Sequence, residues 1–455
     1  MTTPLSAPKW SFGRPGQGPL VEWQTHYRLQ DGVITDALGS RLTSEIADLI
    51  DVAVAVFVTD RLQRRRPPGA TDDGTYWERR LPLEVAVRRP DTWNEPSVYR
   101  LLHELLHWLT DDEWQITFIG GGPRLPRHSE TQGALFDRPL AEPASAGLLS
   151  GGLDSLLGAA ADLQGAGELL LVSTSTHNKL GNRQHKIATT LAAIGPRRVR
   201  WLGVPVNLTA EGRTLGEGSE EPSQRSRAFV FLALGAAAAI CGNCDELRVY
   251  ENGPGALNLA LTAGQRGAMN TRAMRPETLS MMSRLVSAVT GFTFAMVNPN
   301  AWSTKAEMCA RASRELDHAI AGCRSCDTAL IGRRPKDAPC GRCTSCVLRR
   351  QALLTAGRHD LDRLDVQMMR GDSFRAHIPG QTERSLRLMI GQVHQLSSCL
   401  AADDPWASLI RRWPDLAGAR MAQGVPPEMF LDLFQRYCGE WRRLGLPAIE
   451  RLLAA

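Results

Sequence analysis

The sequence predicts an α/β protein built around a parallel sheet with helices on both faces. The chain has 455 residues, 43% of them apolar, enough for roughly two to three domains with buried cores. Between about residues 144 and 360, short β-type runs alternate with helix-like runs, and this alternation is typical of a parallel sheet. A glycine turn joins one of these runs to the next helix. Because ligands of such sheets bind beyond the carboxyl ends of the strands, we look for a site at that turn.

The first part of the chain predicts a small α/β domain over residues 1–142, which we expect to bind a partner. Apolar residues recur at helical spacing in one stretch and alternate as in a strand in the next. The expected elements are helices at 40–65 and 97–109 and strands at 80–89 and 114–119. A stretch rich in Gly, Pro and polar residues, 121–143, predicts a linker.

The middle region, 143–360, carries the predicted parallel sheet, and residues 361–455 predict a helical extension. The expected order is strand, glycine turn, helix, strand, helix, strand. The strands are expected at 146–149, 168–173 and 198–206, and the second helix at 185–194.

Composition limits the classes of function. The net charge of +5 comes from 53 basic and 48 acidic residues in mixed order, so a nucleic-acid partner is not favoured. The N-terminus has no apolar targeting segment, and the longest uncharged apolar run, 228–242, is too short to span a membrane. We therefore expect a cytoplasmic protein, in which paired cysteines are metal ligands or thiols.

The glycine turn predicts an anion site. Glycines let the backbone approach a phosphate closely, and the start of a helix favours negative charge. Asp154 suits either Mg²⁺ or helix capping. A plain strand–turn–helix capped by Ser or Asp is the alternative interpretation. The six residues of the turn are Ser150, Gly151, Gly152, Leu153, Asp154 and Ser155.

Four cysteines with the spacing C-x13-C-x2-C-x2-C predict a closed, structural zinc site. The expected ligands are Cys326, Cys340, Cys343 and Cys346. Cys323 is an alternative to Cys326, and unligated cysteines are the alternative to a metal site. A separate pair, Cys241 and Cys244, follows an alanine-rich apolar helix, and we interpret it as buried thiols.

The SGGLDS turn resembles the PP-loop of the ATP pyrophosphatase superfamily, whose members cleave ATP between its α- and β-phosphates. Together with CGRCTSCVLRR, it resembles the QueC family of 7-cyano-7-deazaguanine (preQ0) synthases. NRQHKIATTL, PSQRSRAFVFLALGAA and STKAEMCA are similar to further QueC segments, so the resemblance spans about residues 146–357.

The resemblance implies a PP-loop fold, the cofactors ATP, Mg²⁺ and Zn²⁺, and a 7-deazaguanine substrate. It implies that the six residues of the turn, with Arg225, bind ATP and its pyrophosphate. Catalytic roles are implied for Asp154, Lys305 and Arg227, and substrate contacts for His185 and Arg275.

The residues themselves leave alternatives open. Arg225 and Arg227 precede an apolar helix, so they either contact an anion or end the helix in solvent. Lys305 opposes the dipole of a helix start, which favours an anion contact, whereas Thr304 and Glu307 fit a capping box. His185 is either an ordinary helix-surface residue or a site residue.

Two departures from the QueC pattern bear on function. The segment 251–279 replaces the family's substrate-binding stretch, and only Arg275-Pro276-Glu277 is similar to it. The chain also has added regions at both ends. Enlarged QueC-like proteins of this kind resemble components of anti-phage systems, QatC of Qat and the QueC-like protein of type IV CBASS.

Our hypothesis is an AMP-forming ligase that activates a 7-deazaguanine carboxylate or nitrile and conjugates it to an amine of a partner protein of a defence operon. The alternatives are a housekeeping preQ0 synthase, a non-catalytic nucleotide-binding scaffold and a tRNA-modifying enzyme. The last fits less well because a catalytic cysteine pair would have to be Cys241 and Cys244.

An H-E-x-x-H motif at His103, Glu104 and His107 matches the spacing of zinc proteases. No third ligand stands at a diagnostic distance, and the nearest candidates are Glu113, His128 and Glu130. We therefore interpret the segment as an ordinary amphipathic helix.

Overall fold

The computed structural model describes residues 9–65, 78–122, 145–216, 220–223, 225–262, 264–265, 267, 270–327, 339–362 and 381–445. From residue 123 on, the predicted linker at 121–143 lies outside this part of the chain. None of the described helices is long and apolar enough to cross a bilayer.

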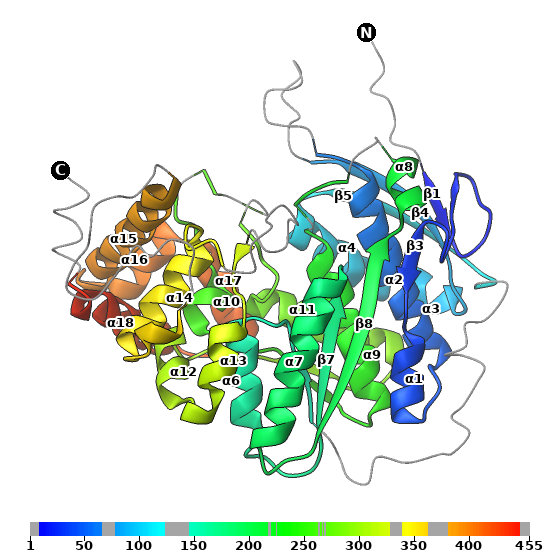
Figure 1. Cartoon of the computed structure of the whole chain (residues 1–455). Coiled ribbons are helices and arrows are strands. Elements are labelled where there is room, and N and C mark those ends of the chain that lie inside the picture. Colours follow the sequence, from blue (N-terminus) through cyan, green and yellow to red (C-terminus); the bar gives the residue numbers. More distant parts are fainter. Residues whose placement is uncertain are drawn as a thin grey trace.

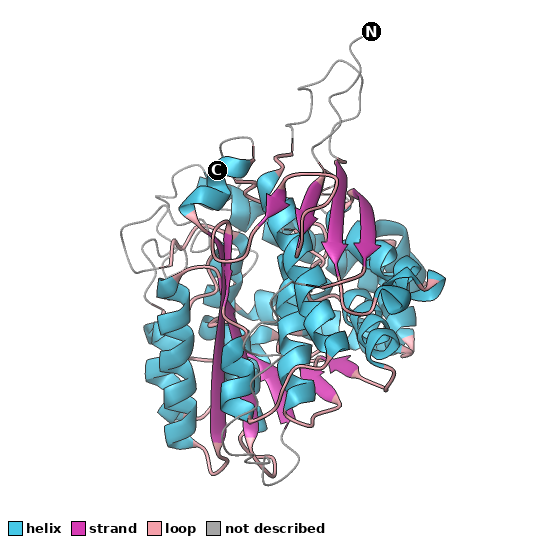
Figure 2. Cartoon of the chain, turned by 90° about the vertical axis from the view of Figure 1, so that its right-hand side faces the viewer, coloured by secondary structure: helices cyan, strands magenta, loops and turns pink. Residues whose placement is uncertain are grey.

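The described residues form an α/β structure with two sheets, which confirms the predicted class (Figures 1 and 2). The smaller sheet has the order β2-β1-β4-β5, and its strands are parallel. Its strands are β1 (Trp10–Phe12), β2 (Leu20–Val21), β4 (Arg80–Ala86) and β5 (Glu113–Ile119). The predicted strands at 80–89 and 114–119 are β4 and β5.

The larger sheet has six strands in the order β10-β9-β6-β7-β8-β3. Five strands are parallel, and β3 pairs antiparallel with β8 at one edge. The strands are β3 (Tyr27–Leu29), β6 (Ser145–Leu148), β7 (Leu169–Ser175), β8 (Val199–Leu208), β9 (Glu246–Arg248) and β10 (Ala295–Val297). β7 is buried throughout, as expected for a strand covered on both faces.

Helices cover both faces of this sheet, as predicted. Residues of one face form a core with α2 (Ser44–Leu62), α4 (Pro96–Thr110), α9 (Arg227–Cys241) and α11 (Pro276–Thr290). The opposite face packs against α6 (Leu153–Asp162), α7 (Asn178–Ile194), α12 (Lys305–Arg311), α13 (Asp317–Gly322) and α14 (Thr344–Thr355). Shorter helices are α1 (Gly32–Leu38), α3 (Pro90–Asn94), α8 (Ala210–Leu215) and α10 (Gly253–Leu257).

The N-terminal region shares the core of the larger sheet. β3 completes that sheet, and α2 packs against α9. Fifteen residues of α2 are buried, including Val56 and Val58, which are fully inaccessible to solvent. The predicted division at residue 142 stays a prediction, but the described residues on its two sides form one continuous apolar cluster.

The C-terminal region is helical, as predicted, and forms a bundle at the side of the molecule opposite β1 (Figure 1). It consists of α15 (Gln381–Leu400), α16 (Pro405–Arg412), α17 (Asp415–Gln423) and α18 (Pro427–Arg443). The bundle has its own apolar core, which extends to Leu257 and Leu259 of the middle region.

Candidate functional site

The glycine turn lies at the carboxyl end of β6, where the strand order changes direction. The chain passes from β6 to β7 on one side, and later to β9 on the other side of β6. In open parallel sheets such a switch point leaves a crevice for ligands. The turn 149–152 leads directly into α6, so the start of that helix faces the crevice.

Glycine is required in this turn by the backbone. Gly151 has φ of +86°, a left-handed conformation that side chains disfavour. Gly152 is the N-cap of α6 and supplies no capping side chain, so no N-cap side chain competes with an anion at the amides that follow Leu153. The Ser150 and Ser155 hydroxyls lie 3.0 Å apart and are hydrogen-bonded, and the Gly152 amide donates to Ser150 Oγ at 3.3 Å.

Asp154 is paired with the predicted catalytic lysine. Lys305 Nζ lies 2.7 Å from Asp154 Oδ2, and both residues are buried. Asn252 Nδ2 donates to Asp154 Oδ1 at 3.0 Å. Asp154 does not cap α6, which removes the capping alternative and leaves its carboxylate for the site.

A second carboxylate, Glu251, shares the same amide. Asn252 Nδ2 also donates to Glu251 Oε1, at 2.6 Å. Burial, and next the nearby Asp154 charge, raise the pKa of Glu251 to about 8. Burial alone would lower the pKa of Lys305, but Asp154 and Glu251 outweigh it and raise that pKa above its usual value. The group therefore combines the Asp154 carboxylate, the Glu251 carboxyl group, which keeps its proton near neutral pH, and the protonated Lys305 ammonium.

Lys305 is held by a formed capping box. Thr304 is the N-cap of α12, its hydroxyl accepts from the Glu307 amide, and the Glu307 carboxylate accepts from the Thr304 amide, as predicted. Helix α18 reinforces this end of α12, because Arg436 pairs with Glu307 and the buried Glu440 carboxylate accepts from the Thr304 hydroxyl.

The two arginines at the start of α9 face different surroundings. Arg227, together with Phe231, lines the cavity beside the turn, and burial followed by repulsion from Arg61 lowers its pKa to about 10. Arg225 is not among the cavity-lining residues. Burial, then Arg65, lowers the pKa of Arg225 to about 10 within a charge cluster that contains Asp60.

The two predicted substrate residues lie outside this cavity. His185 is exposed on α7, and its ring stacks on Trp201 with centroids 4.8 Å apart. Arg275 is buried, donates to Glu277 and to the carbonyl oxygen of Leu257, and lines a second cavity.

A different histidine, His177, lines the cavity in their place. It follows β7 and caps α7 through its Nδ1 atom, which accepts from the Leu180 amide at 3.1 Å. Burial, then Arg183 and Lys179, lowers its pKa, so its ring is neutral at physiological pH. The sequence signal for His177 is its position immediately after a β-type run.

The cavity has a volume of about 400 Å³. Ser150, Gly152 and Asp154 of the turn line it together with Lys305 and Arg227, whereas Gly151, Leu153 and Ser155 are not among its lining residues. Further lining residues come from the segment that carries the four cysteines and from the C-terminal bundle. The contributions of the bundle are Met389, Gln392 and Tyr437. No local feature of the sequence indicates that these three residues line the same cavity as Ser150.

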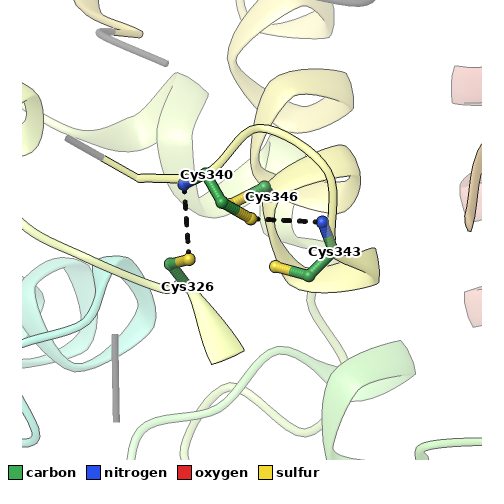
Figure 3. A group of neighbouring side chains, drawn as sticks. All are labelled: Cys326, Cys340, Cys343 and Cys346. Atoms are coloured by element: carbon green, nitrogen blue, oxygen red, sulfur yellow. Dashed lines mark hydrogen bonds between the residues drawn. The ribbon is translucent and has the colours of Figure 1, made fainter. Parts of the chain in front are cut away.

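The four cysteines predicted as zinc ligands converge (Figure 3). Their sulfur atoms lie within 4.8 Å of one another, and the Arg342 and Cys343 amides donate to Cys340 Sγ. Four thiol groups so placed fit a structural Zn²⁺ ion held by Cys326, Cys340, Cys343 and Cys346. Cys323 is not part of the cluster; its thiol contacts Ile320 and Arg349 instead.

The cysteine cluster is joined directly to the glycine turn. The Arg324 amide donates to the Gly151 carbonyl oxygen at 3.1 Å, and the Leu153 amide donates to Ser325 Oγ at 3.1 Å. Both partners immediately precede Cys326. A metal that fixes Cys326 would therefore also fix the turn.

Within the described residues, the cysteine cluster is the one group of three or more potential ligands close enough to hold a metal. His103 stacks on Tyr99, and His107 contacts the Asp112 carbonyl oxygen, which agrees with an ordinary helix. Cys241 and Cys244 belong to the apolar core, and burial raises the pKa of each thiol to about 11, in agreement with buried thiols.

A parallel α/β sheet with a glycine turn at its switch point is a PP-loop-like architecture. Residues 270–357 match the family described as QueC: Queuosine biosynthesis protein QueC, so the chain is QueC-like over a segment that includes Lys305 and the four cysteines. The turn at 150–155 lies outside the matched residues. A search of curated proteins finds no match.

Proposed function

We propose that this chain is an ATP-dependent, AMP-forming QueC-like ligase that activates a 7-deazaguanine and conjugates it to an amine of a partner protein in anti-phage defence. The observation that carries the proposal is the convergence of the glycine turn, Asp154, Lys305 and Arg227 on one cavity at the switch point. The QueC match supports an ATP-using enzyme of 7-deazaguanine chemistry.

The cavity suits the formation of an adenylate from 7-carboxy-7-deazaguanine. A carboxylate oxygen of the substrate attacks the α-phosphorus of ATP, the bond to the β-phosphate breaks, and pyrophosphate leaves. The amides at the start of α6 would bind the departing pyrophosphate, and Lys305 and Arg227 would balance the negative charge that develops on the phosphates. In the second step an amine attacks the acyl carbon, AMP leaves, and the amine proton passes to solvent.

Asp154, and Glu251 once it has released its proton, would hold a magnesium ion that accompanies ATP, because carboxylate oxygens are the ligands this ion prefers. The ion would neutralise phosphate charge and supply Lewis acidity. Asn252 orients both carboxyl groups through its amide group, and Lys305 holds Asp154 through a direct ion pair.

The added regions support an acceptor larger than ammonia. Tyr437, Gln392 and Met389 give the C-terminal bundle a share of the cavity wall, so an acceptor bound to the bundle would lie beside the activated carboxyl group. Asn258, which precedes the matched segment, and Thr271, which lies within it, contribute to the adjoining wall.

The proposal is tested by incubating the purified chain with α-labelled ATP, Mg²⁺ and either 7-carboxy-7-deazaguanine or preQ0, with and without ammonia and the neighbouring proteins of its operon. We expect AMP, pyrophosphate and a deazaguanine-sized mass added to one protein. Asp154→Ala should abolish both products, whereas Asp403→Ala, which removes an exposed carboxylate outside the cavity, should keep both.

Other outcomes would assign other functions. Free preQ0 as the sole product with ammonia would identify a housekeeping preQ0 synthase and overturn protein conjugation. ATP binding without AMP under any of these conditions would identify a scaffold and overturn the enzymatic proposal.

A further inference from the structure

A second cavity, of about 530 Å³, adjoins the nucleotide cavity. Leu259 and Thr271 line both cavities, so the wall between them is formed by the described residues of the loop 258–271. Up to residue 269, this loop precedes the segment that matches the QueC family. The far side of the second cavity is formed by the end of α16 and the start of α17.

Hydrogen bonds join the two ends of the loop 258–271. Asn258, with φ of +43°, donates from Nδ2 to the Thr271 carbonyl oxygen at 2.8 Å and to Asn270 Oδ1 at 3.1 Å. The Asn270 amide group donates back to the Asn258 carbonyl oxygen. These bonds bring the two ends of the loop together.

The C-terminal bundle holds the body of the loop. Gln392 Nε2 of α15 donates to the Leu259 carbonyl oxygen at 2.8 Å, and the Trp413 indole donates to the Ala260 carbonyl oxygen at 3.1 Å. The cavity is thus built jointly by the loop 258–271, the residues that follow it and the C-terminal bundle.

The lining of the second cavity is rich in arginine. It contains Arg272, Arg275, Arg411 and Arg412, with Asp415 as its one acidic member among the described residues. Arg275 is neutralised by Glu277, and Arg272 is paired with Asp111 and stacked on Trp108. Arg411 and Arg412 are exposed in the last turn of α16. Arg412 donates to the neutral Gln395, so the positive charge of this turn is left for an anionic ligand.

A carboxylate-bearing peptide fits this cavity better than a nucleic acid does. Binding of single-stranded nucleic acid relies on aromatic faces on which bases stack. The aromatic residue of the lining, Trp413, is only 6% exposed, and its indole N–H is already bonded to Ala260. The planar guanidinium groups of arginine pair well with carboxylates. The lining of the second cavity combines such groups with the apolar residues Leu259 and Ala260.

We propose that the second cavity binds an acidic peptide segment of the acceptor protein, with its carboxylates against Arg411 and Arg412. A peptide segment bound in the second cavity is separated from the nucleotide cavity by the loop 258–271. An amine near this segment in the acceptor sequence can therefore reach past Leu259 and Thr271 to the activated carboxyl group. This inference rests on the proposed conjugation to a partner protein and adds the chemistry by which that partner is recognised.

The test measures binding of a fluorescein-labelled octaglutamate peptide to the full chain by fluorescence anisotropy, without ATP. Arg411→Glu should weaken binding about tenfold, because it removes one charged contact and adds a repulsive one. Arg443→Glu is the matched control, since it makes the same charge change in the last turn of α18 and lies outside the cavity lining. It should leave the affinity unchanged.

Equal weakening by the two variants would show attraction to the overall charge of the protein and overturn the inference. Tighter binding of an octauridine RNA that is lost in Arg411→Glu would assign the cavity to nucleic acid and also overturn it. Competition by inorganic phosphate at equal charge concentration would overturn it in favour of a simple anion site.

The result is independent of the proposed reaction. Octaglutamate binding that depends on Arg411, in a wild-type protein that forms no AMP, would support the cavity and contradict the ligase. AMP formation by a wild-type protein that does not bind octaglutamate would support the ligase and contradict the peptide-binding cavity.

Discussion

Asp154, Lys305 and Glu251 form a compact cluster of ionisable groups. This cluster affects the stability of the protein even when no ligand is bound. Lys305 compensates the Asp154 carboxylate through a direct contact, while Glu251 is buried close to Asp154. Because the pKa of Glu251 is raised to about 8 from 4.5, the folded protein holds this proton at pH values where the unfolded chain has lost it.

The stability of the free protein should therefore fall as the pH rises from about 5 to about 8. Glu251→Gln should reduce this fall, because glutamine keeps the contact with Asn252 and does not ionise. Urea unfolding at several pH values in this range, without nucleotide, measures the slope. Glu428→Gln, an exposed position in the first turn of α18, is the control and should keep the wild-type slope. An unchanged slope in Glu251→Gln would contradict the prediction.

At the scale of residues, the sequence predicts site residues that stand within motifs better than site residues that stand between motifs. Asp154, Lys305, Arg227 and the cysteines stand in recognisable patterns, and the structure brings the first three to one cavity. Arg225 is only two residues from Arg227, yet it faces the Asp60 cluster, because successive positions at a helix start point in different directions. Glu251 follows β9, a strand of three residues that the sequence does not reveal, and Tyr437 likewise has no local signal.

At the scale of elements, the segment that carries the cysteines and the glycine turn act as one unit. Gly151 and Leu153 are bonded to Arg324 and Ser325, which precede Cys326. Hydrogen bonding to Cys326 and Cys346 raises the pKa of the Cys343 thiol. Zinc must therefore displace protons, and its affinity should fall with falling pH.

Cys343→Ser should remove the zinc, lower the melting temperature by about 5 °C or more, and weaken ATP binding, because the turn loses its anchored neighbour. Metal analysis, thermal unfolding and nucleotide titration measure the three effects. Cys399→Ser, which changes a cysteine of the bundle core, should retain one zinc ion per chain. Full ATP affinity in zinc-free Cys343→Ser protein would show that the turn does not depend on the metal.

The longer elements agree with expectation, whereas the three-residue strands of the larger sheet do not appear in it. Helices α2 and α4 and strands β4, β5, β7 and β8 lie where periodicity and apolar runs predict them. Strands β3, β9 and β10 have three residues each, which is too short for alternation to be recognised. β3 is also an edge strand whose partner β8 lies about 180 residues later in the chain, and pairing at such distance leaves no mark in the local sequence.

At the scale of the whole molecule, the N-terminal region is part of the central core. α2 packs on α9, and Asp60 Oδ2 accepts from the amide and hydroxyl of Ser226, directly before Arg227. The region that we expect to bind a partner therefore also positions one wall of the nucleotide cavity.

A protease site introduced between residues 123 and 144 tests this integration. After cleavage, the two fragments should elute together from a size-exclusion column at the volume of the uncut protein, because the apolar cluster spans the cut. Separation of the fragments without denaturant would show that residues 1–142 fold and stand alone.

The share of the C-terminal bundle in the nucleotide cavity has a consequence for biosynthesis. Ser150 and Asp154 are translated in the first half of the chain, but the cavity they line also needs Met389, Gln392 and Tyr437. A ribosome must therefore have synthesised the chain as far as Tyr437 before this cavity is complete. Nascent and prematurely terminated chains carry the SGGLDS turn without a finished cavity around it, so the proposed ATP chemistry would be confined to chains that include the C-terminal bundle.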